Sequence, residues 1–593
     1  MIVRITLVLL FATLIASCGG GSSSTSNEPN PVPPPITPPP TNVQPTLSNV
    51  VANAQSIALY EKIEWSIDAN AQYDNPFDSR DVSLSALLTA PNGNEITVAG
   101  YWDTRRGWKI RFSPSLIGQW QFAMTITDGG GTSDAVAGEF TVTQSTSKGM
   151  IKVANQINPD YSPRYFLHQD GSEFYGIGHS DTFAIFRNSD TADRFITTLK
   201  NANENYYVWW PQYYFPITEN TYQNFHLANV EVIDEVIEKT EQADLKLVFT
   251  IWDHSQLRDN SHPWSDGRWQ THNGFRQLTS ATDFFTNEEA WQWQQNLYRY
   301  IIARWGHSPA IAMWQTVSEI DGTNAFENAN AWHQKVNEYF KTNDPYQHPT
   351  TGSMAGDKTW PEGHRVMDAP QVHIYRDLLT NRDDTRSPAK VIESASIIAN
   401  YTQNMWQENA KPNWIGEFGV INHPVNQGQN YYPEVFHQAL WSALAAGAAM
   451  TPAEWNDFSD WGQLTSSMIT SLQHFATFVD RLSLAKWQPK PLEITSPTNT
   501  KTWGIAGEQG GMIWLQDTTL QGETITAIRQ QRLPTAPLSI EVNNLPAGDY
   551  QITPYNTQQG EFLTPLSLTC QTNIPCLIAV PAFLGDIALL ITR

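Results

Sequence analysis

Two glutamates stand in sequence settings where a carboxylate could do chemistry. Glu319 follows an apolar segment that begins at Ile311, and Glu417 follows another that begins near Pro412. The two carboxylates lie 98 residues apart in the chain. Two carboxylates that face one another are the groups needed to cleave a glycosidic bond. The protonated one supplies a proton to the leaving oxygen, and the ionised one attacks the anomeric carbon.

The segments that must position these glutamates alternate between short apolar runs and helical stretches over residues 163–485. Helical periodicity of 3.6 residues is visible at 232–237 and at 291–305. The apolar runs begin near Phe174, Tyr206, Leu247, Ile311, Thr350, Gln371, Asn413 and Gly447. Eight strand–helix units predict a (β/α)8 barrel (a TIM barrel), in which chemistry sits at the carboxyl ends of the strands. The spacing of the glutamates equals three units, which assigns them to strands four and seven.

Both flanks of this region show strand patterns instead. Over residues 46–145, apolar residues such as Trp108, Ile110 and Phe112 alternate with polar ones, and short runs are separated by turn residues. This pattern predicts an Ig-like β-sandwich. Short strands return over residues 486–593 and predict a smaller C-terminal β-sandwich. The chain is therefore expected to be a multidomain protein with a central barrel between two sandwiches.

The N-terminus has the pattern of an export signal. Residues 1–17 carry a basic residue and then an apolar stretch too short to span a membrane as a mature helix. The ending at Cys18 resembles a bacterial lipobox, which implies lipidation of that cysteine, and Gly19 resembles the residue found there in outer-membrane lipoproteins. Residues 18–45 are rich in Gly, Ser and Pro and predict a tether. A cleaved signal with a free cysteine is the alternative.

The composition limits the classes of molecule that the folded part can bind. The 593 residues carry a formal net charge of −23, which argues against nucleic-acid binding. The 23 Trp, 21 Tyr and 25 Phe fit either large cores or aromatic platforms for sugars. Cys570 and Cys576 lie six residues apart in a predicted hairpin, and an oxidising compartment favours a disulfide between them. We expect a monomer that contacts the membrane through its lipid anchor only.

The residues around the two glutamates also resemble a known family. Trp314, Ser318-Glu319-Ile-Asp-Gly322 and Trp414-Ile-Gly-Glu417-Phe-Gly419 are similar to the motifs of retaining glycoside hydrolases with a barrel fold, those like family 5. The resemblance covers residues 163–485. It implies that Glu319 is the acid/base, that Glu417 is the nucleophile, and that no cofactor or metal is needed.

The resemblance implies further contacts, with one departure. Family members usually carry Asn before the acid/base, where it binds the sugar 2-hydroxyl, whereas this chain has Ser318. His373 and Tyr375 end strand six, where the family often places a residue that touches the nucleophile. Trp455 ends strand eight, where the family often places a Trp floor under the sugar.

Other polar and aromatic residues at predicted strand ends are candidates for substrate contacts, although each fits a packing role equally well. They are His179, Asp181, Trp209, Trp210, Tyr213, Tyr214, Asp253 and His254. A metal site at His254, His262 and His272 is a weaker alternative, because their spacing matches no known ligand pattern.

The sequence thus predicts a membrane-tethered hydrolase that cleaves a β-linked plant or algal polysaccharide, or an oligosaccharide derived from one, with retention of configuration. The acid excess favours a neutral polymer over a strongly anionic one. Two alternatives remain open at this point. One is a non-catalytic surface lipoprotein that binds glycans on a barrel scaffold, and the other is an accessory protein that acts on peptidoglycan or host glycans.

Overall fold

The described part of the chain folds into several sheets and helices that surround separate cores. The computed structural model describes residues 43–103, 107–180, 189–379, 388–420, 432–455, 464–519 and 533–593. Residues 44–593 form one unit. Within these described stretches, no helix combines the length and the apolar character that crossing a bilayer would require.

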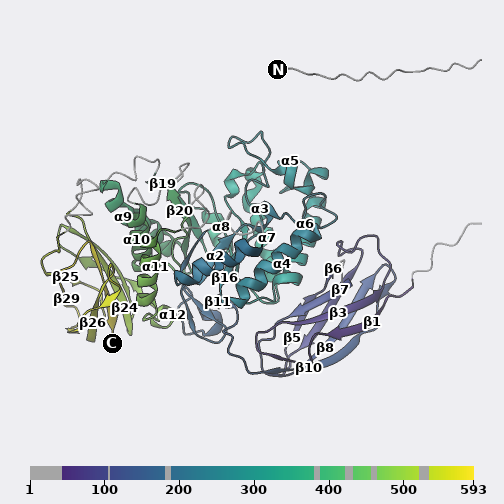
Figure 1. Cartoon of the computed structure of the whole chain (residues 1–593), viewed down its shortest axis with the longest axis horizontal. Helices are drawn as coiled ribbons and strands as arrows, with labels where there is room; N and C mark the ends of the chain where they lie inside the picture. The colour runs from purple at the N-terminus through teal and green to yellow at the C-terminus, as the bar shows by residue number, and fades with distance from the viewer. Residues whose placement is uncertain are drawn as a thin grey trace, which may run out of the picture. The chain divides into compact units, whose positions relative to one another are not determined.

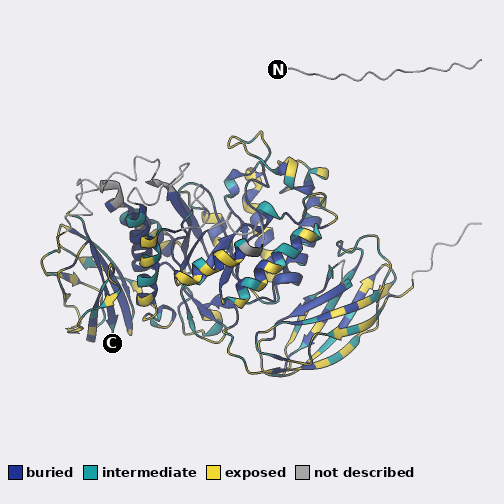
Figure 2. Cartoon of the chain, in the orientation of Figure 1, coloured by how far each residue is buried: buried dark blue, intermediate teal, exposed yellow. Residues whose placement is uncertain are grey.

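Two sheets enclose the first core. One has the strand order β1-β3-β7-β6, and the other has the order β2-β10-β8-β4-β5, with β9 paired to β8. Alternation along the strands places Trp65, Leu84 and Trp120 in the shared core, while exposed residues lie between the buried ones (Figure 2). The strands are β1 Thr46–Ala52, β2 Ser56–Ala58, β3 Ile63–Asn70, β4 Ser83–Thr89, β5 Glu95–Ala99, β6 Tyr101–Asp103, β7 Gly107–Phe112, β8 Gly118–Asp128, β9 Gly131–Thr132 and β10 Val136–Thr143.

Parallel strands and helices alternate through the middle of the chain (Figure 1). One parallel sheet has the order β14-β15-β16-β17-β18, and β19 pairs with β20. The strands are β14 Gly178–Ser180, β15 Tyr206–Trp209, β16 Lys246–Thr250, β17 Ile311–Val317, β18 Thr350–Gly352, β19 Gln371–Leu379 and β20 Trp414–Val420. Strands β15 to β18 are buried throughout, as expected for parallel strands covered on both faces.

Helices follow most of these strands, and their ends carry ordinary capping signals. For example, the Asn287 side chain accepts a hydrogen bond from the Ala290 N–H at the start of α6 (2.8 Å). The helices of eight residues or more are α2 Ser189–Asn201, α4 Leu227–Gln242, α6 Glu288–Trp305, α7 Ala329–Asn343, α9 Pro388–Glu408, α10 Tyr432–Ala445 and α11 Ser466–Val479. The short ones are α1 Ala154–Ile157, α3 Pro211–Tyr214, α5 Trp269–His272, α8 Pro361–Val366 and α12 Leu484–Trp487. The helical periodicity seen at 232–237 and 291–305 lies in α4 and α6.

The eighth apolar run contributes isolated bridges rather than a full strand. Met450 bridges to Gly176, Glu454 to Phe418, and Trp455 to Ser180. Between β18 and β19 the contacts are single hydrogen bonds, such as the one from Gln371 Nε2 to Thr351 Oγ1 (3.0 Å). The strand ladders of the described residues therefore form a five-stranded arc, a pair and three bridges, and they contain no closed barrel.

One strand assignment from the sequence is wrong. Phe174 was expected to begin the first parallel strand, but it lies in β13 (Glu173–Phe174), which pairs antiparallel with β12 (Phe166–His168). Strand β12 also pairs antiparallel with β11 (Ile151–Val153). The first parallel strand is β14, which is only three residues long and carries the polar residues His179 and Ser180. An apolar run of ordinary strand length is therefore absent where the barrel pattern begins.

The C-terminal part consists of two further sheets around their own core. The larger has the order β21-β23-β24-β30-β26-β27, with β28 paired to β26, and the smaller has the order β22-β25-β29. A disulfide joins Cys570 to Cys576, whose Cα atoms are 5.3 Å apart. The strands are β21 Lys490–Pro491, β22 Ile494–Thr495, β23 Thr500–Ala506, β24 Gly510–Asp517, β25 Leu538–Val542, β26 Gly548–Asn556, β27 Glu561–Phe562, β28 Leu566–Cys570, β29 Cys576–Val580 and β30 Asp586–Thr592.

A buried ionic cluster joins the N-terminal sheets to the helices of the central region. Asp234 of α4 accepts hydrogen bonds from Arg304 Nε (3.0 Å) and Trp305 Nε1 (2.8 Å) of α6, and from Arg111 of β7 (3.3 Å). Arg111 also donates to Glu64 of β3 (2.7 Å). Because Arg111 and Arg304 are almost fully buried, each depends on these carboxylates for its charge partner.

Candidate active site

Glu319 lies directly after β17 in a backbone conformation that few residues adopt. Its φ and ψ angles are 57° and 59°, the left-handed region. For a residue with a side chain this conformation costs about 1–3 kcal/mol, so the surroundings must hold it. The Glu319 N–H donates to Ser353 Oγ (3.0 Å), and the next N–H, of Ile320, donates to the Ser353 carbonyl (3.0 Å). Strand β18 leads into Ser353, so two neighbouring strands fix the direction of the Glu319 side chain.

Glu417 lies within β20, and the neighbouring strand β19 supplies its partners. The ladder places His373 directly beside Glu417. Tyr375 lies two residues further along β19 and points to the same face, because side chains alternate along a strand. The Tyr375 hydroxyl donates to Glu417 Oε2 (2.8 Å), and His373 Nδ1 lies 3.2 Å from the same oxygen. Glu417 is 4% exposed, so it must rely on these groups to be ionised.

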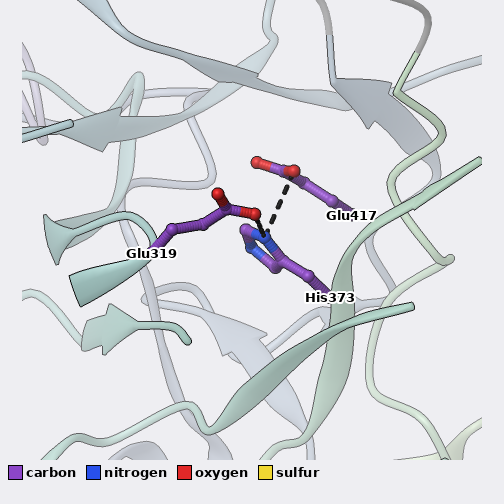
Figure 3. Close-up of side chains that lie close together, drawn as sticks. All are labelled: Glu319, His373 and Glu417. Carbon is purple, nitrogen blue, oxygen red and sulfur yellow. Dashed lines mark hydrogen bonds and ion pairs between the residues drawn. The ribbon is translucent and has the colours of Figure 1, made fainter. Parts of the chain in front are cut away.

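His373 connects the two carboxylates (Figure 3). Its Nδ1 lies 2.8 Å from Glu319 Oε1 and 3.2 Å from Glu417 Oε2. One carboxylate oxygen of Glu319 and one of Glu417 lie within 4.8 Å of each other. The structure therefore brings together, from the end of β17 and from within β19 and β20, both glutamates and the histidine that the sequence singled out.

The electrostatics of this group favour the protonated form of the histidine. Burial would lower the pKa of His373, but the charge of Glu417 and the hydrogen bond with Glu319 raise it above its ordinary value. Burial would raise the pKa of the Glu319 carboxyl, but the hydrogen bond from His373 and the nearby His254 outweigh burial and lower it. Both carboxylates thus favour the protonated form of His373.

The same three residues could also hold a metal ion. Among the residues that the structure describes, Glu319, His373 and Glu417 form the one group of His and acidic side chains whose donor atoms converge in this way. Two carboxylates and an imidazole are suitable ligands for a divalent ion. The 2.8 Å separation of His373 Nδ1 and Glu319 Oε1 also fits a shared proton. His254, His262 and His272, the weaker alternative, do not form such a group.

Ser318, which stands where the similar family has Asn, is fully buried beside Glu319. Its N–H donates to the Trp252 carbonyl (2.9 Å), and it bridges to Asp253 at the end of β16. Its hydroxyl has no hydrogen-bond partner within the described residues. A buried hydroxyl without a partner is unusual, so this atom is available to a ligand.

Aromatic rings gather next to the glutamates. Trp210 lies 5.0 Å from Trp455 and 5.6 Å from His254, measured between ring centroids. His254 Nδ1 lies 3.5 Å from Glu319 Oε2, and burial lowers the pKa of His254 despite that carboxylate. Tyr213 is half-buried after β15 and lies under the Arg268 guanidinium, 3.8 Å from the ring centroid. These four residues from the sequence-based set lie near the glutamates.

Two other members of that set lie on the opposite face of their strands. Trp209 packs on Phe249 in the layer between strands and helices. His179 pairs with the buried Glu204 (Nδ1 to Oε1, 2.6 Å) and packs against Phe195 of α2. Neither position gives a reason to place the side chain against a substrate. Asp181 and Cys18 lie outside the described residues.

In the segment between β16 and α5 the sequence singled out Asp253, His254 and His262, but not Trp264 or Arg258. Trp264 in this segment is 39% exposed, and its ring lies 5.6 Å from that of His254. The ring packs so closely on Gly322 that a Cβ there would lie 2.4 Å from it. Arg258, in the same segment, is close enough for its charge to lower the pKa of Glu319. A long loop after a parallel strand often carries binding or catalytic residues, so the length of this segment was a signal in the sequence.

Comparison with known proteins places the fold but names no close relative. Residues 56–127, in the N-terminal sheets, match a family model described as a domain of unknown function (DUF5060). No curated protein matches the chain in sequence.

Several solved structures share the fold. One, from Bacteroides vulgatus ATCC 8482 and assigned as a glycoside hydrolase, has a TM-score of 0.64 at 14% identity, covering 91% of this chain and all of that one. A second, described as a glycoside hydrolase, has a TM-score of 0.50 at 11% identity, covering 75% of this chain and 97% of that one. A third, a family 5 glycoside hydrolase from Bacteroides vulgatus ATCC 8482, has a TM-score of 0.50 at 12% identity, covering 75% and 94%. At these identities the likeness concerns the fold alone, and the chain has the multidomain fold of these glycoside hydrolases.

Proposed function

We propose that this chain is a retaining glycoside hydrolase that cleaves β-glycosidic bonds with Glu319 and Glu417. The observation that carries the proposal is the short separation of the two carboxylates, one oxygen of each lying within 4.8 Å. Retaining enzymes hold these groups about 5–5.5 Å apart, whereas inverting enzymes leave about 6.5–9.5 Å for a water molecule. The geometry therefore favours direct attack by one carboxylate on the sugar.

The proposal includes a (β/α)8 arrangement of the central region. Strands β14 to β18 pair in parallel, β19 and β20 form a second parallel pair, and the run at 450–455 bridges to both β14 and β20. Glu319 lies two residues past the carboxyl end of β17, and His373 of β19 lies within contact distance of both Glu319 and Glu417. The carboxyl end of the strands is the end of a barrel at which enzymes carry their active sites.

The chemistry would follow two displacements. Glu417 Oε attacks the anomeric carbon and forms a glycosyl ester, while the bond to the leaving oxygen breaks and Glu319 transfers its proton to that oxygen. Glu319 then removes a proton from a water molecule, which attacks the same carbon and releases Glu417. The Tyr375 hydroxyl would stabilise the Glu417 carboxylate before attack, since it donates to the same group at 2.8 Å.

His373 supplies the proton that the first step needs. The lowered pKa of Glu319 means that this carboxyl is ionised near neutral pH, although an acid must be protonated. His373 has a raised pKa and contacts Glu319 at 2.8 Å. Transfer of the Nδ1 proton to Glu319 Oε1 would produce the acid and leave a neutral imidazole between the carboxyls.

Two substitutions test the proposal. Glu417→Ala and Glu319→Ala should each slow reducing-end release from a cleaved β-linked plant or algal polysaccharide by several orders of magnitude. Glu408→Ala is the matched control, because this glutamate pairs with His364 (3.0 Å) away from the site. Wild-type turnover in either site variant would refute the assignment, as would a first-formed product of inverted configuration in an NMR time course.

Two further results would redirect the proposal. Binding of polysaccharide without release of reducing ends would establish a glycan-binding protein instead of an enzyme. Loss of activity in a chelator, restored by a divalent ion, would mean that Glu319, His373 and Glu417 hold a metal. Under the mechanism above, activity is unchanged by the chelator.

We also propose that the protein is exported and anchored by lipid on Cys18. The apolar stretch and small residues before this cysteine support the proposal. Metabolic labelling with a fatty acid should label the wild-type protein, whereas Cys18→Ser should be unlabelled and released from the membrane fraction.

A further inference from the structure

Two arginines in the segment that follows β16 form no ion pair with any residue that the structure describes. Arg258 and Arg268 belong to the segment between β16 and α5, where the Arg268 N–H donates to the Ser255 carbonyl (2.8 Å). Within the described residues neither guanidinium lies within ion-pair distance of a carboxylate. In each, the Nη1 atom is buried without a hydrogen-bond partner.

The unpartnered Nη1 atoms set them apart from the arginines that join the N-terminal sheets to the helices, including Arg299, which donates to the carbonyls of Gly100 (3.3 Å) and Leu84 (3.0 Å). Arg111 and Arg304 are also buried, but both donate to Asp234. Arg80, which is more exposed, donates to Asp78 (2.7 Å) and Glu289 (3.0 Å). A buried charge without a partner is costly, and proteins retain one where it has a use.

Arg258 is the more deeply placed of the two. It is 5% exposed, its Nε donates to the Ser265 carbonyl (2.7 Å), and its guanidinium lies 5.6 Å from the Trp264 ring centroid. Burial lowers its pKa and outweighs the attraction of Asp253, Asp266 and Glu319. The nearby carboxylates therefore leave this cation undercompensated.

Arg268 and Asp253 are two further charged residues of this segment. The Arg268 guanidinium stacks on Tyr213 at 3.8 Å, which fixes its plane. Asp253 Oδ1 accepts from the N–H groups of Ser255 (3.0 Å) and Gln256 (3.2 Å), so this carboxylate is used to hold the local turn. The carboxylates of Asp253, Asp266 and Glu319 thus lie near Arg258, but within the described residues none of them forms an ion pair with it.

We propose that Arg258 and Arg268 bind an acidic group of the substrate, so that the enzyme acts on a glycan that carries carboxylate or sulfate substituents. This inference rests on the proposed function and names its substrate class. Guanidinium groups match the paired oxygens of a carboxylate or sulfate and bind them with two parallel hydrogen bonds. The net charge of −23 describes the whole chain, whereas the charge of Arg258 acts on Glu319 and Arg268 belongs to the same segment as Arg258.

Matched substrates test the inference with purified full-length protein. The first pair is a β-linked polyuronate and its carboxyl-reduced form, and the second is a sulfated β-galactan and its desulfated form. We expect kcat/KM to be higher for the charged member of one pair, and the pair that responds identifies carboxylate or sulfate. Arg258→Gln and Arg268→Gln should each lower kcat/KM for that charged member by about 10- to 100-fold, the loss expected for a hydrogen bond to a charged group. The loss should be smaller for its neutral counterpart.

Two further variants show whether a loss of activity is specific to the guanidinium groups of Arg258 and Arg268. Arg481→Gln removes an arginine that is exposed and packs over Phe562 at 5.6 Å, so it should behave as wild type. Arg258→Lys keeps the charge but loses the paired N–H groups of the guanidinium. Its kcat/KM for the charged substrate should fall between the values of wild type and Arg258→Gln. Thermal unfolding of every variant shows whether a loss of activity reflects a loss of fold.

The outcomes separate this inference from the proposed function. Preference for the neutral member of both pairs, or equal losses on charged and neutral forms, would overturn the inference and leave the glycosidase proposal standing. If wild type cleaves none of the four polymers, titration calorimetry with the same polymers decides. Tighter binding of a charged polymer that weakens in Arg258→Gln supports the inference, and equal binding of charged and neutral forms overturns it.

Discussion

The hydrogen bond from the Tyr375 hydroxyl should assist Glu417, the proposed nucleophile. It donates to Glu417 Oε2 at 2.8 Å, in a place where the carboxylate is almost fully buried. Removal of a hydrogen bond to a charged group costs about 1.5–3 kcal/mol, and about 1.4 kcal/mol corresponds to a tenfold change in rate. Tyr375→Phe should therefore lower kcat by about 10- to 100-fold, measured by reducing-end release at saturating substrate.

Tyr207→Phe is the matched control for this change. The Tyr207 hydroxyl also lies in a buried hydrogen bond, to Thr240 of α4 (2.6 Å), but on the face of β15 that contacts the helices. Its loss should reduce stability and leave kcat unchanged. Equal kcat in wild type and Tyr375→Phe would show that the hydroxyl does not assist Glu417.

Among the residues of the candidate site, the sequence identifies those that follow a recognisable apolar run. Glu319 and Glu417 could be recognised because each follows an apolar run, and His373 could be recognised from its resemblance to a family. The sequence does not show which of Trp209 and Trp210 lies on the side of the glutamates. The reason is that the neighbouring strands decide which face each side chain of β15 takes. Arg258 had no sequence signal of its own, because an unpaired charge is defined by contacts that only the fold creates.

The elements that meet at Asp234 make a prediction about stability. This carboxylate of α4 pairs with Arg304 of α6 and with Arg111 of the N-terminal sheets. Removal of one partner leaves buried charges uncompensated, which costs about 3 kcal/mol or more. Asp234→Asn should therefore lower the urea midpoint of unfolding, followed by tryptophan fluorescence.

The same helix offers a control at its surface. Glu238 of α4 pairs with Lys62 of the N-terminal part at 3.5 Å, but its side chain is 58% exposed. An exposed pair contributes at most about 1 kcal/mol. Glu238→Gln should therefore shift the urea midpoint little. A shift as large as that of Asp234→Asn would mean that burial of the Asp234 cluster is not what stabilises this junction.

At the element scale, most of the strand positions in the central region follow from apolar runs. Strands β15, β17, β18 and β19 begin where the sequence places them, because these runs are buried on both faces and bounded by polar residues. The first strand was misplaced, since β14 is short and polar while Phe174 belongs to a more apolar neighbour that pairs elsewhere. A strand that ends in polar residues looks like a loop until its partners are known.

For the whole molecule, buried histidines make stability depend on pH. Burial lowers the pKa of His168 to about 4 and that of His333 to about 3, and it lowers the pKa of His307 well below its ordinary value. In the unfolded chain these residues take up protons near pH 6.5. Their contribution to stability is therefore complete above pH 6.5 and is lost as the pH falls below it, by up to about 1.4 kcal/mol per pH unit for each histidine.

His373 acts in the opposite direction, because its pKa is raised in the folded state. Its contribution is complete below pH 6.5 and is lost as the pH rises through the folded pKa. Three histidines with lowered pKa values outweigh this single one, so the free energy of unfolding should fall from pH 7 to pH 5, measured by urea titration. His333→Gln should give a shallower slope, because one proton fewer is taken up on unfolding. An unchanged slope would mean that His333 is protonated in the folded protein, where its Nε2 lies 3.0 Å from both Thr316 Oγ1 and Asn337 Nδ2.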